Sequence, residues 1–419
     1  MSPNHVVVLG SGFAGLETAF ALRALANPDQ VRLSLVSDRD DFLFRPNSIY
    51  LPFGAAEAPL HVPLAKALRR KEIDSHIAHA EGIDTERGVV HTSRGPVPYD
   101  QLVIATGAAM RPEEVPGLAE HAHTVWSPGR LHALGEQLQW VVQHAAHAQL
   151  QRVLFLVPPN NKCAGPLYEI ALMLDTWLRR REVRDNVQLA FTTSERSYVQ
   201  AFGPKLHDVV AAEFAQRGIE GRTGAAPDKV SELEVAYTDG TTQDFDLLVA
   251  FPPYVAAQRF EGLPTDDRGF LTCEASTREV LGHPGVYAPG DAGDFPVKQA
   301  FLALLQAQAV AGQIAADTGA HLPGTGFEPV SMCVLEMFDK ATFAQVPLSV
   351  TGDAEQPVVV DPAAGDAYRV GTSAAWRLGK KALGTYVPGR FRAGLPVHAG
   401  TGWDAMALGL RGATRWLTR

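Results

Sequence analysis

One cysteine of this chain lies in a local sequence that favours a reactive thiol. Cys163 follows a short apolar run, residues 153–157, and precedes apolar residues at helical spacing, namely Leu167, Ile170, Ala171 and Leu174. This pattern predicts a buried parallel strand, a tight turn and a helix that begins near Pro166. The helix N-terminus and the neighbouring Lys162 would both stabilise a thiolate at Cys163. A buried structural cysteine is the alternative interpretation, and these residues alone do not separate the two.

The turn before Cys163 lacks the glycines that a dinucleotide-binding loop needs. Pro158, Pro159, Asn160 and Asn161 stand where the backbone would have to approach a pyrophosphate closely. We therefore expect that this turn does not hold a nicotinamide dinucleotide.

A glycine loop of that kind does occur at the start of the chain. An apolar run, residues 5–9, leads into Gly10, Gly12 and Gly15, and an apolar helix pattern follows. The next strand pattern, residues 31–36, ends at Ser37 and Asp38. This order predicts a dinucleotide-binding unit in which Gly10 makes the turn, Gly12 admits the pyrophosphate and Gly15 lets the helix pack closely on the strand. Ser37 stands where a ribose-binding acid is usual, and Asp38 follows it, so both are candidates to bind the ribose.

Two later stretches indicate which dinucleotide binds. Residues 99–108 form a strand pattern that ends in Ala105, Thr106 and Gly107, and residues 286–293 form another that ends in Gly290 and Asp291. Here the chain resembles the flavoproteins with two dinucleotide-binding domains. The resemblance implies FAD as the cofactor, with the first turn beside it and Asp291 as the ligand of its ribityl chain.

Other segments resemble one branch of these flavoproteins, sulfide:quinone oxidoreductase. They are residues 37–46, which include Arg45, residues 163–169, residues 332–337, and the Trp376, Lys380 and Tyr386 stretch. Flavocytochrome c sulfide dehydrogenase is similar around both cysteines. The resemblance implies that Cys163 and Cys333 meet as a redox-active pair beside the flavin, that Arg45 contributes to the FAD site, and that sulfide and quinone are the substrates.

Two further residues are candidates for catalytic roles. Lys298 opens an apolar helix pattern that runs to about residue 318, so its ammonium and the helix N-terminus would stabilise a reduced flavin. An exposed lysine at a helix end is the alternative. Glu169 would either assist proton transfer near Cys163 or only favour the first turn of its helix.

The chain departs from the quinone branch by lacking a cysteine in residues 123–129. The remaining cysteine, Cys273, is expected to be a packed core thiol. We therefore expect FAD to be bound without a covalent link, and the identity of the sulfur donor is left open. We expect no metal site, since His132, His144 and His147 fall on the solvated face of a helix pattern without another ligand in register.

Charge divides the chain in two. From residue 367 to the end, nine basic residues face one acid, so this tail carries +8 and the rest of the chain −17. The tail also holds Trp376, Trp403 and Trp416, and basic residues mixed with aromatic ones are typical of an amphipathic membrane-surface helix. A basic surface packed on the acidic body is the alternative, and nucleic acid is disfavoured. Tyr386 and Phe391 are candidates to flank the quinone ring, or else to pack within the tail.

We therefore predict an α/β protein with two Rossmann-like domains of the FAD/NAD(P)-binding type and a C-terminal membrane-binding region. The expected limits are 1–112 and 270–325 for the FAD domain, 150–269 for the second domain and 326–419 for the tail region. We expect no signal peptide and a peripheral position on the cytoplasmic side of a membrane, and a homo-oligomer is compatible with the sequence. Three rival functions stay open: a sulfide dehydrogenase coupled to a cytochrome, an NAD(P)H-dependent quinone or disulfide reductase, and an FAD-bound redox sensor.

Overall fold

A parallel β-sheet near the N-terminus carries the first glycine loop. In the computed structural model, which describes residues 3–320, 324, 326–353, 355–399 and 401–418, this sheet has the strand order β20-β9-β1-β2-β5. Its strands are β1 (Asn4–Leu9), β2 (Val31–Ser37), β5 (Ile73–Ile77), β9 (Gln101–Ile104) and β20 (Val286–Tyr287). Two helices pack against each other beside it, α1 (Phe13–Leu25) and α7 (Ala300–Asp317), so two segments that are far apart in the sequence build this domain.

The second parallel sheet has the order β11-β18-β12-β13-β14. Its strands are β11 (His123–Thr124), β12 (Gln151–Val157), β13 (Val187–Thr193), β14 (Ile219–Arg222) and β18 (Leu247–Ala250). The accompanying helices are α4 (Pro128–Ala146), α5 (Gly165–Arg179) and α6 (Gly203–Arg217). β12 pairs with β13 on one side and β18 on the other and is buried at almost every residue. This position explains why its sequence is almost continuously apolar.

Smaller elements connect and cover the two sheets. The antiparallel additions are β6 (Ala80–Asp84), β7 (Val89–Thr92) and β8 (Gly95–Pro98); β15 (Pro227–Val230), β16 (Glu234–Tyr237) and β17 (Thr242–Asp244); β3 (Asp41–Leu43) with β4 (His61–Pro63); and β10 (Ala108–Met110) with β19 (Tyr254–Ala256). The short helices are α2 (Ala65–Arg70) and α3 (Leu118–His121), and the 3₁₀ segments include η1 (Arg45–Phe53), η2 (Ala58–Leu60) and η6 (Gly290–Ala292).

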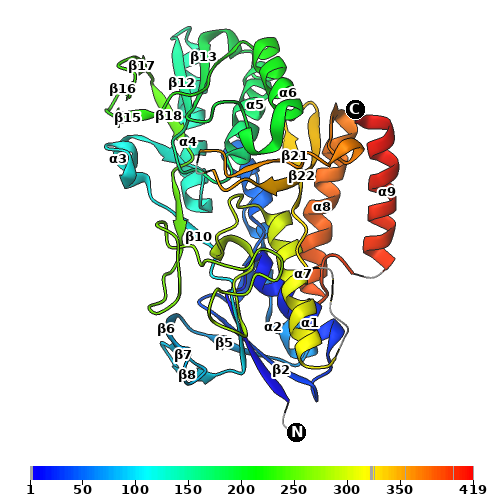
Figure 1. The fold of residues 1–419 in the computed structure, drawn as a ribbon. Helices are drawn as coiled ribbons and strands as arrows, with labels where there is room; N and C mark the ends of the chain where they lie inside the picture. The colour runs from blue at the N-terminus through cyan, green and yellow to red at the C-terminus, as the bar shows by residue number, and fades with distance from the viewer. Residues whose placement is uncertain (1–2, 321–323, 325, 354, 400, 419) are drawn as a thin grey trace.

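The C-terminal region adds an antiparallel sheet and two helices on one flank of the molecule (orange and red in Figure 1). The sheet contains β21 (Val330–Glu336), β22 (Ala341–Val350), β23 (Val358–Val360) and β24 (Arg369–Ser373), and the helices are α8 (Ala374–Arg392) and α9 (Thr401–Leu417). β21 contacts α5 of the second domain, α7 of the first and α8 of the tail. The region therefore lies at the junction of both sheets.

This architecture confirms the predicted α/β class with two Rossmann-like sheets. The limits of the domains stay a prediction, and residue 325, the expected end of the FAD domain, lies outside the described residues. The same holds for Arg419 and for the side chains of Arg411, Arg415 and Trp416 in the tail. Among the described residues, no helix is long and apolar enough to cross a membrane.

Candidate functional site

Each glycine of the first loop, Gly10, Gly12 and Gly15, has a different structural role. Gly10 has a φ of +102°, and a Cβ there would lie 2.4 Å from the carbonyl oxygen of Ala105. A Cβ on Gly15 would lie 1.9 Å from the carbonyl oxygen of Gly10, so only glycine lets α1 pack this closely on the loop. A Cβ on Gly12 would meet no atom within 4 Å. The loop is therefore open at Gly12, at the N-terminus of α1, where a pyrophosphate would be held.

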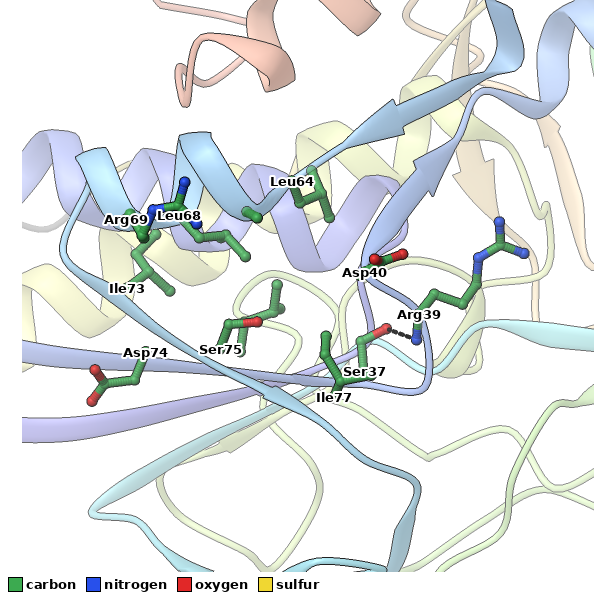
Figure 2. A pocket seen from close by; sticks show the side chains of 12 residues that line it. Ser37, Arg39, Asp40, Leu64, Leu68, Arg69, Ile73, Asp74, Ser75 and Ile77 are labelled. Carbon is green, nitrogen blue, oxygen red and sulfur yellow. Dashed lines mark hydrogen bonds between the residues drawn. The ribbon is translucent and has the colours of Figure 1, made fainter. Parts of the chain in front are cut away.

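Ser37 ends β2 beside this loop. Its hydroxyl is hydrogen-bonded to that of Ser11 at 2.9 Å and accepts from the backbone N–H of Arg39 at 3.2 Å. Ser37 and Arg39 also line an open pocket of about 510 Å³ between β2, β5 and α2, and Leu64 and Leu68 line it from the side of α2 (Figure 2). Asp38 is exposed next to it. Both candidate ribose ligands thus lie where the adenosine half of a dinucleotide would extend from the loop.

The other two predicted turns meet the glycine loop. The N–H of Ala105 donates to the carbonyl of Leu9 at 2.9 Å, which places Thr106 and Gly107 beside β1. Gly107 has a φ of +80° and open space at its Cβ position. Gly290 has a φ of +74°, and a Cβ there would lie 2.8 Å from that of Ala14 on α1. The residues expected to hold FAD are therefore gathered at one edge of the first sheet.

Asp291 is a partly buried carboxyl group on which two cations act, the buried Lys298 and the exposed Arg45. Burial raises its pKa, and the charges of Lys298 and Arg45 lower it again. The guanidinium of Arg45 lies 4.5 Å from the ring centre of Trp126 and donates to the Trp126 carbonyl at 2.9 Å. Two cations thus converge on the residue expected to bind the ribityl chain.

Lys298 differs from its predicted setting in one respect. The helix α7 begins at Ala300, so Lys298 precedes it rather than opening it. The lysine is 4% exposed, not at a solvated helix end, and its ammonium donates to the Gly293 carbonyl and lies 3.8 Å from the ring centre of Phe270. Burial lowers the pKa of Lys298 to about 7, against the opposing effect of Asp291. A nearby anion would favour its charged form.

The structure brings Cys163 and Cys333 together. Cys163 lies just before α5, and Cys333 lies on β21, which packs on that helix. Burial raises the pKa of both thiols, that of Cys163 to about 12, and the charge of Cys163 contributes to the rise at Cys333. The two thiols are therefore electrostatic neighbours in one partly buried site, although they come from different domains.

The prediction of a stabilised Cys163 thiolate is only partly met. The N–H of Gly165, in the first turn of α5, donates to the sulfur and lowers its pKa, as expected of a helix N-terminus. Burial raises the pKa of Cys163 by more than this hydrogen bond lowers it, and the charges of Asp291 and Glu169 raise it further. Burial lowers the pKa of the Lys162 ammonium, and Asp266 and Asp267 oppose this, so its predicted help to a Cys163 thiolate stays a prediction.

Glu169 faces the cysteine site from the first turns of α5. Its carboxylate accepts from the ammonium of Lys380 on α8 and from the backbone N–H of Glu336 at 2.8 Å. Lys380 also donates to the Val334 carbonyl at 3.1 Å. Burial raises the pKa of Glu169, and Lys380 is the largest opposing influence. Glu169 is therefore a buried, ion-paired carboxylate rather than only a residue that favours a helix start.

A second buried carboxylate beside this pair was not predicted. Glu336 is fully buried, accepts from Arg377 of α8 at 2.7 Å and accepts from the hydroxyl of Tyr50 at 3.0 Å. The signal was present in the sequence, since Glu336 follows Cys333 by three residues and Arg377 precedes Lys380 by three. Their pairing depends on tertiary structure, which periodicity alone does not give.

Three other predictions concern residues near the site. Cys273 is a buried thiol in the core of the first domain, and its sulfur lies 3.2 Å from the Leu271 carbonyl oxygen. Phe391 is fully buried against Phe42, with ring centres 4.9 Å apart, so its candidate role beside quinone is wrong. The Tyr386 hydroxyl donates to the Val397 carbonyl at 2.9 Å, which favours a packing role for Tyr386 as well.

In the part of the chain described here, no cluster of His, Cys, Asp and Glu could hold a metal ion.

Comparisons with known proteins agree with this geometry. Residues 4–139 match the family model of pyridine nucleotide-disulphide oxidoreductases. The sulfide-quinone reductase of Aquifex aeolicus is 34% identical over 242 residues, which cover 56% of this chain and 54% of that protein. The solved sulfide:quinone oxidoreductase from the same organism has a TM-score of 0.84 at 23% identity and covers 97% of this chain and 96% of its own. The expected resemblance to sulfide:quinone oxidoreductase is confirmed.

The comparisons also define how far this resemblance reaches. The sequence match spans about half the length of the Aquifex relative, whereas the structural match spans nearly the whole chain and establishes the fold. A nitric oxide reductase FlRd-NAD(+) reductase of Aeromonas hydrophila is 26% identical over 69% of this chain and 70% of its own, so nucleotide-linked oxidoreductases are also relatives. FAD is the cofactor that the fold, the glycine loop and these relatives support.

Proposed function

We propose that this chain oxidises sulfide, or a related sulfur compound, through Cys163 and Cys333, and passes the electrons by way of FAD to a membrane quinone. The observation that carries the proposal is the shared, partly buried site of the two thiols, at a turn that has prolines and asparagines in place of glycines. The names of the sulfide-quinone reductase relatives support the same substrates.

The paired cysteines provide chemistry for the sulfur half of the reaction. Hydrosulfide attacks one sulfur of a Cys163–Cys333 disulfide, so the new sulfur–sulfur bond gives a persulfide on one cysteine and releases the other as a thiolate. The sulfide sulfur is oxidised and the disulfide is reduced in this step. The N–H of Gly165 stabilises a thiolate at Cys163, whereas Lys380 stabilises one at Cys333.

The charges around the thiols suit proton and charge control. Glu169 lies close enough to raise the pKa of both cysteines when it is ionised. A proton on Glu169 would remove that effect, so the carboxyl group can take the proton that a thiol releases. Lys380 keeps the carboxylate charge balanced, and Glu336 with Arg377 forms a second neutral pair behind it.

The residues at the edge of the first sheet would hold FAD without a covalent link. We assign Gly10, Gly12 and Gly15 to the pyrophosphate, Ser37 and Asp38 to the adenosine ribose, and Arg45, Ala105, Thr106, Gly107, Gly290, Asp291 and Lys298 to the rest of the cofactor. FAD, when bound, supplies a two-electron carrier between sulfur and quinone. Since Asp291 also acts on the pKa of Cys163, the FAD edge and the thiols adjoin each other.

The tail region supplies a surface that suits a peripheral membrane protein. Leu378 on α8 and Leu408 on α9 are 69% and 66% exposed, and Leu383 and the basic Lys381 are exposed on α8. Apolar and basic side chains in such helices bind the interface of an anionic bilayer. We propose that quinone reaches the flavin from this side. The side of the membrane stays a prediction, as does a homo-oligomer.

The experiment that tests the proposal compares electron donors. Purified flavoprotein is mixed anaerobically with sulfide or with NADH, and flavin absorbance is followed by stopped flow in the wild type and in Cys163→Ser. We expect fast bleaching by sulfide only in the wild type, and reoxidation by a soluble quinone. Fast bleaching by NADH in both proteins would instead support the nucleotide-dependent rival. Bleaching by sulfide that survives Cys163→Ser would refute the role of the cysteine pair.

A further inference from the structure

The turn before Cys163 is closed by one of its own side chains. The amide nitrogen of Asn161 donates to the carbonyls of Phe251 and Pro252 at 2.9 and 3.2 Å. Its amide oxygen accepts from the backbone N–H of Cys163 at 3.0 Å. Because the two carbonyls can only accept and the Cys163 N–H can only donate, these partners fix the orientation of the amide.

Backbone hydrogen bonds continue this connection along both segments. The N–H of Phe251 donates to Leu156 at 3.2 Å, and the N–H of Tyr254 donates to Asn160 at 3.0 Å. Asn160 has a φ of +63°, a left-handed conformation that asparagine tolerates better than most residues. The β12–α5 turn is therefore fastened, on both sides of the two prolines that precede Cys163, to the segment from Phe251 to Tyr254.

Asn161 is the residue of this turn that holds Cys163 directly. Both prolines of the turn lack an N–H, and the side chain of Asn161 joins Cys163 to a segment almost ninety residues further on. We propose that Asn161 is a positioning residue, which fixes Cys163 at the N-terminus of α5, opposite Cys333, by clamping its backbone to the Phe251–Pro252 carbonyls. The inference rests on the proposed function, in which Cys163 is the reacting thiol.

Loss of the clamp should change Cys163 in a way that differs from general destabilisation. The Cys163 N–H and two carbonyls would lose their partner, and the turn would admit more water to the sulfur of the partly buried Cys163. Burial is the main cause of the raised Cys163 pKa, so hydration would move the pKa downward and speed alkylation. The same displacement would slow attack on the disulfide because bond formation depends on alignment of the sulfurs, and a shift of about 1 Å can cost about a hundredfold.

The test compares Asn161→Ala with Asn160→Gly in the FAD-bound protein. The control removes the neighbouring amide side chain but keeps the left-handed backbone and the Tyr254 hydrogen bond. Alkylation of Cys163 by iodoacetamide is followed by mass spectrometry across a pH series after reduction, with Cys273 as the internal reference for core opening. Flavin reduction by sulfide is measured in parallel.

For Asn161→Ala we expect Cys163 alkylation to rise at least tenfold, with its pH midpoint lower, while Cys273 alkylation stays unchanged and flavin reduction by sulfide slows at least tenfold. Asn160→Gly should match the wild type in all three. If Asn161→Ala does not retain FAD, Asn161→Ser, whose hydroxyl can still accept from the Cys163 N–H, should show the same changes to a smaller degree.

Two results would overturn the inference. One is Cys163 alkylation within twofold of the wild type in Asn161→Ala, and the other is an equal rise at Cys273, which would mean that the whole core has loosened. The alkylation measurement does not depend on the substrate. A Cys163→Ser protein that still bleaches with sulfide would therefore refute the proposed function alone, and the alkylation profile would still decide the role of Asn161.

Discussion

The most quantitative prediction concerns a buried glutamate far from the cysteines. Glu17 lies on α1 with no exposed side-chain surface, and it accepts from the backbone N–H of Val397 at 2.7 Å and from the side chain of Gln308 at 3.1 Å. It thereby holds the segment between α8 and α9 against the first domain. Burial raises the pKa of Glu17 from 4.5 to about 7, and these hydrogen bonds oppose the rise.

This shift sets both the sign and the size of a stability effect. A rise from 4.5 to about 7 is about 2.5 pKa units, which at about 1.36 kcal/mol per unit corresponds to about 3 kcal/mol. The folded protein holds the proton more tightly, so the stability is fully present below pH 4.5 and falls as the pH rises to about 7. His398 beside it has a pKa lowered to about 4 by burial, so it stays neutral over this window.

Glu17→Gln should therefore flatten the pH dependence of stability. The amide keeps an acceptor for the Val397 N–H but cannot ionise. Relative to the wild type, we expect the variant to gain about 2.5 kcal/mol of unfolding free energy between pH 5 and pH 8.5, because part of the effect already falls below pH 5. The constant offset from the changed Gln308 contact does not affect this difference. The measurement is urea unfolding of the FAD-bound protein at both pH values. Glu86→Gln, which changes an exposed carboxylate, is the matched control.

Parallel pH profiles for wild type and Glu17→Gln would refute this reasoning. They would mean that Glu17 is solvated or is matched by another titrating group in the folded protein. A steeper fall in the variant would have the wrong sign and would refute it as well.

Three shorter predictions test other parts of the structure. Lys380→Met leaves Glu169 as an unpaired buried carboxylate and should lower the unfolding free energy by about 3–5 kcal/mol in urea titrations, with partial recovery in the double variant that also has Glu169→Gln. Gly15→Ala should abolish FAD binding, measured by flavin absorbance of the purified protein, because its Cβ would lie 1.9 Å from the Gly10 carbonyl oxygen. Phe391→Ala removes a fully buried ring from the hydrophobic core of the first domain and should lower the free energy of unfolding by about 3–5 kcal/mol in the same urea titrations. A decrease below about 1 kcal/mol would contradict its packing role.

Local patterns in the sequence were sufficient for the elements that bear the two turns. The strand, glycine loop and helix around Gly10, and the strand, turn and helix around Cys163, depend on neighbours within a short stretch of chain. The periodicity of apolar residues and the positions of Gly and Pro report such neighbours directly. Helix limits were less accurate, as the start of α7 two residues after Lys298 shows.

Contacts between distant segments were beyond these patterns. The sequence did not decide whether Glu169 has a catalytic role or only favours the start of its helix. The residues around Glu169 do not indicate that Lys380, more than two hundred residues further on, forms an ion pair with it. The proximity of Cys163 and Cys333 came from the family resemblance rather than from spacing. The sequence left burial of Cys163 as an alternative, because local residues do not show that burial outweighs the helix N-terminus in setting its pKa.

The basic residues of α8 differ in location, because some form ion pairs inside the protein and others are exposed. Arg377 and Lys380 lie about one helical turn apart on α8, and both point inward to the buried carboxylates Glu336 and Glu169. Part of the positive charge of the tail therefore pairs with acids of the protein body, as expected if the tail packs on an acidic body. Lys381 on the same helix is exposed. Since a buried ion pair loses much of its stability when one partner moves, α8 cannot shift without disturbing the charges beside the thiols.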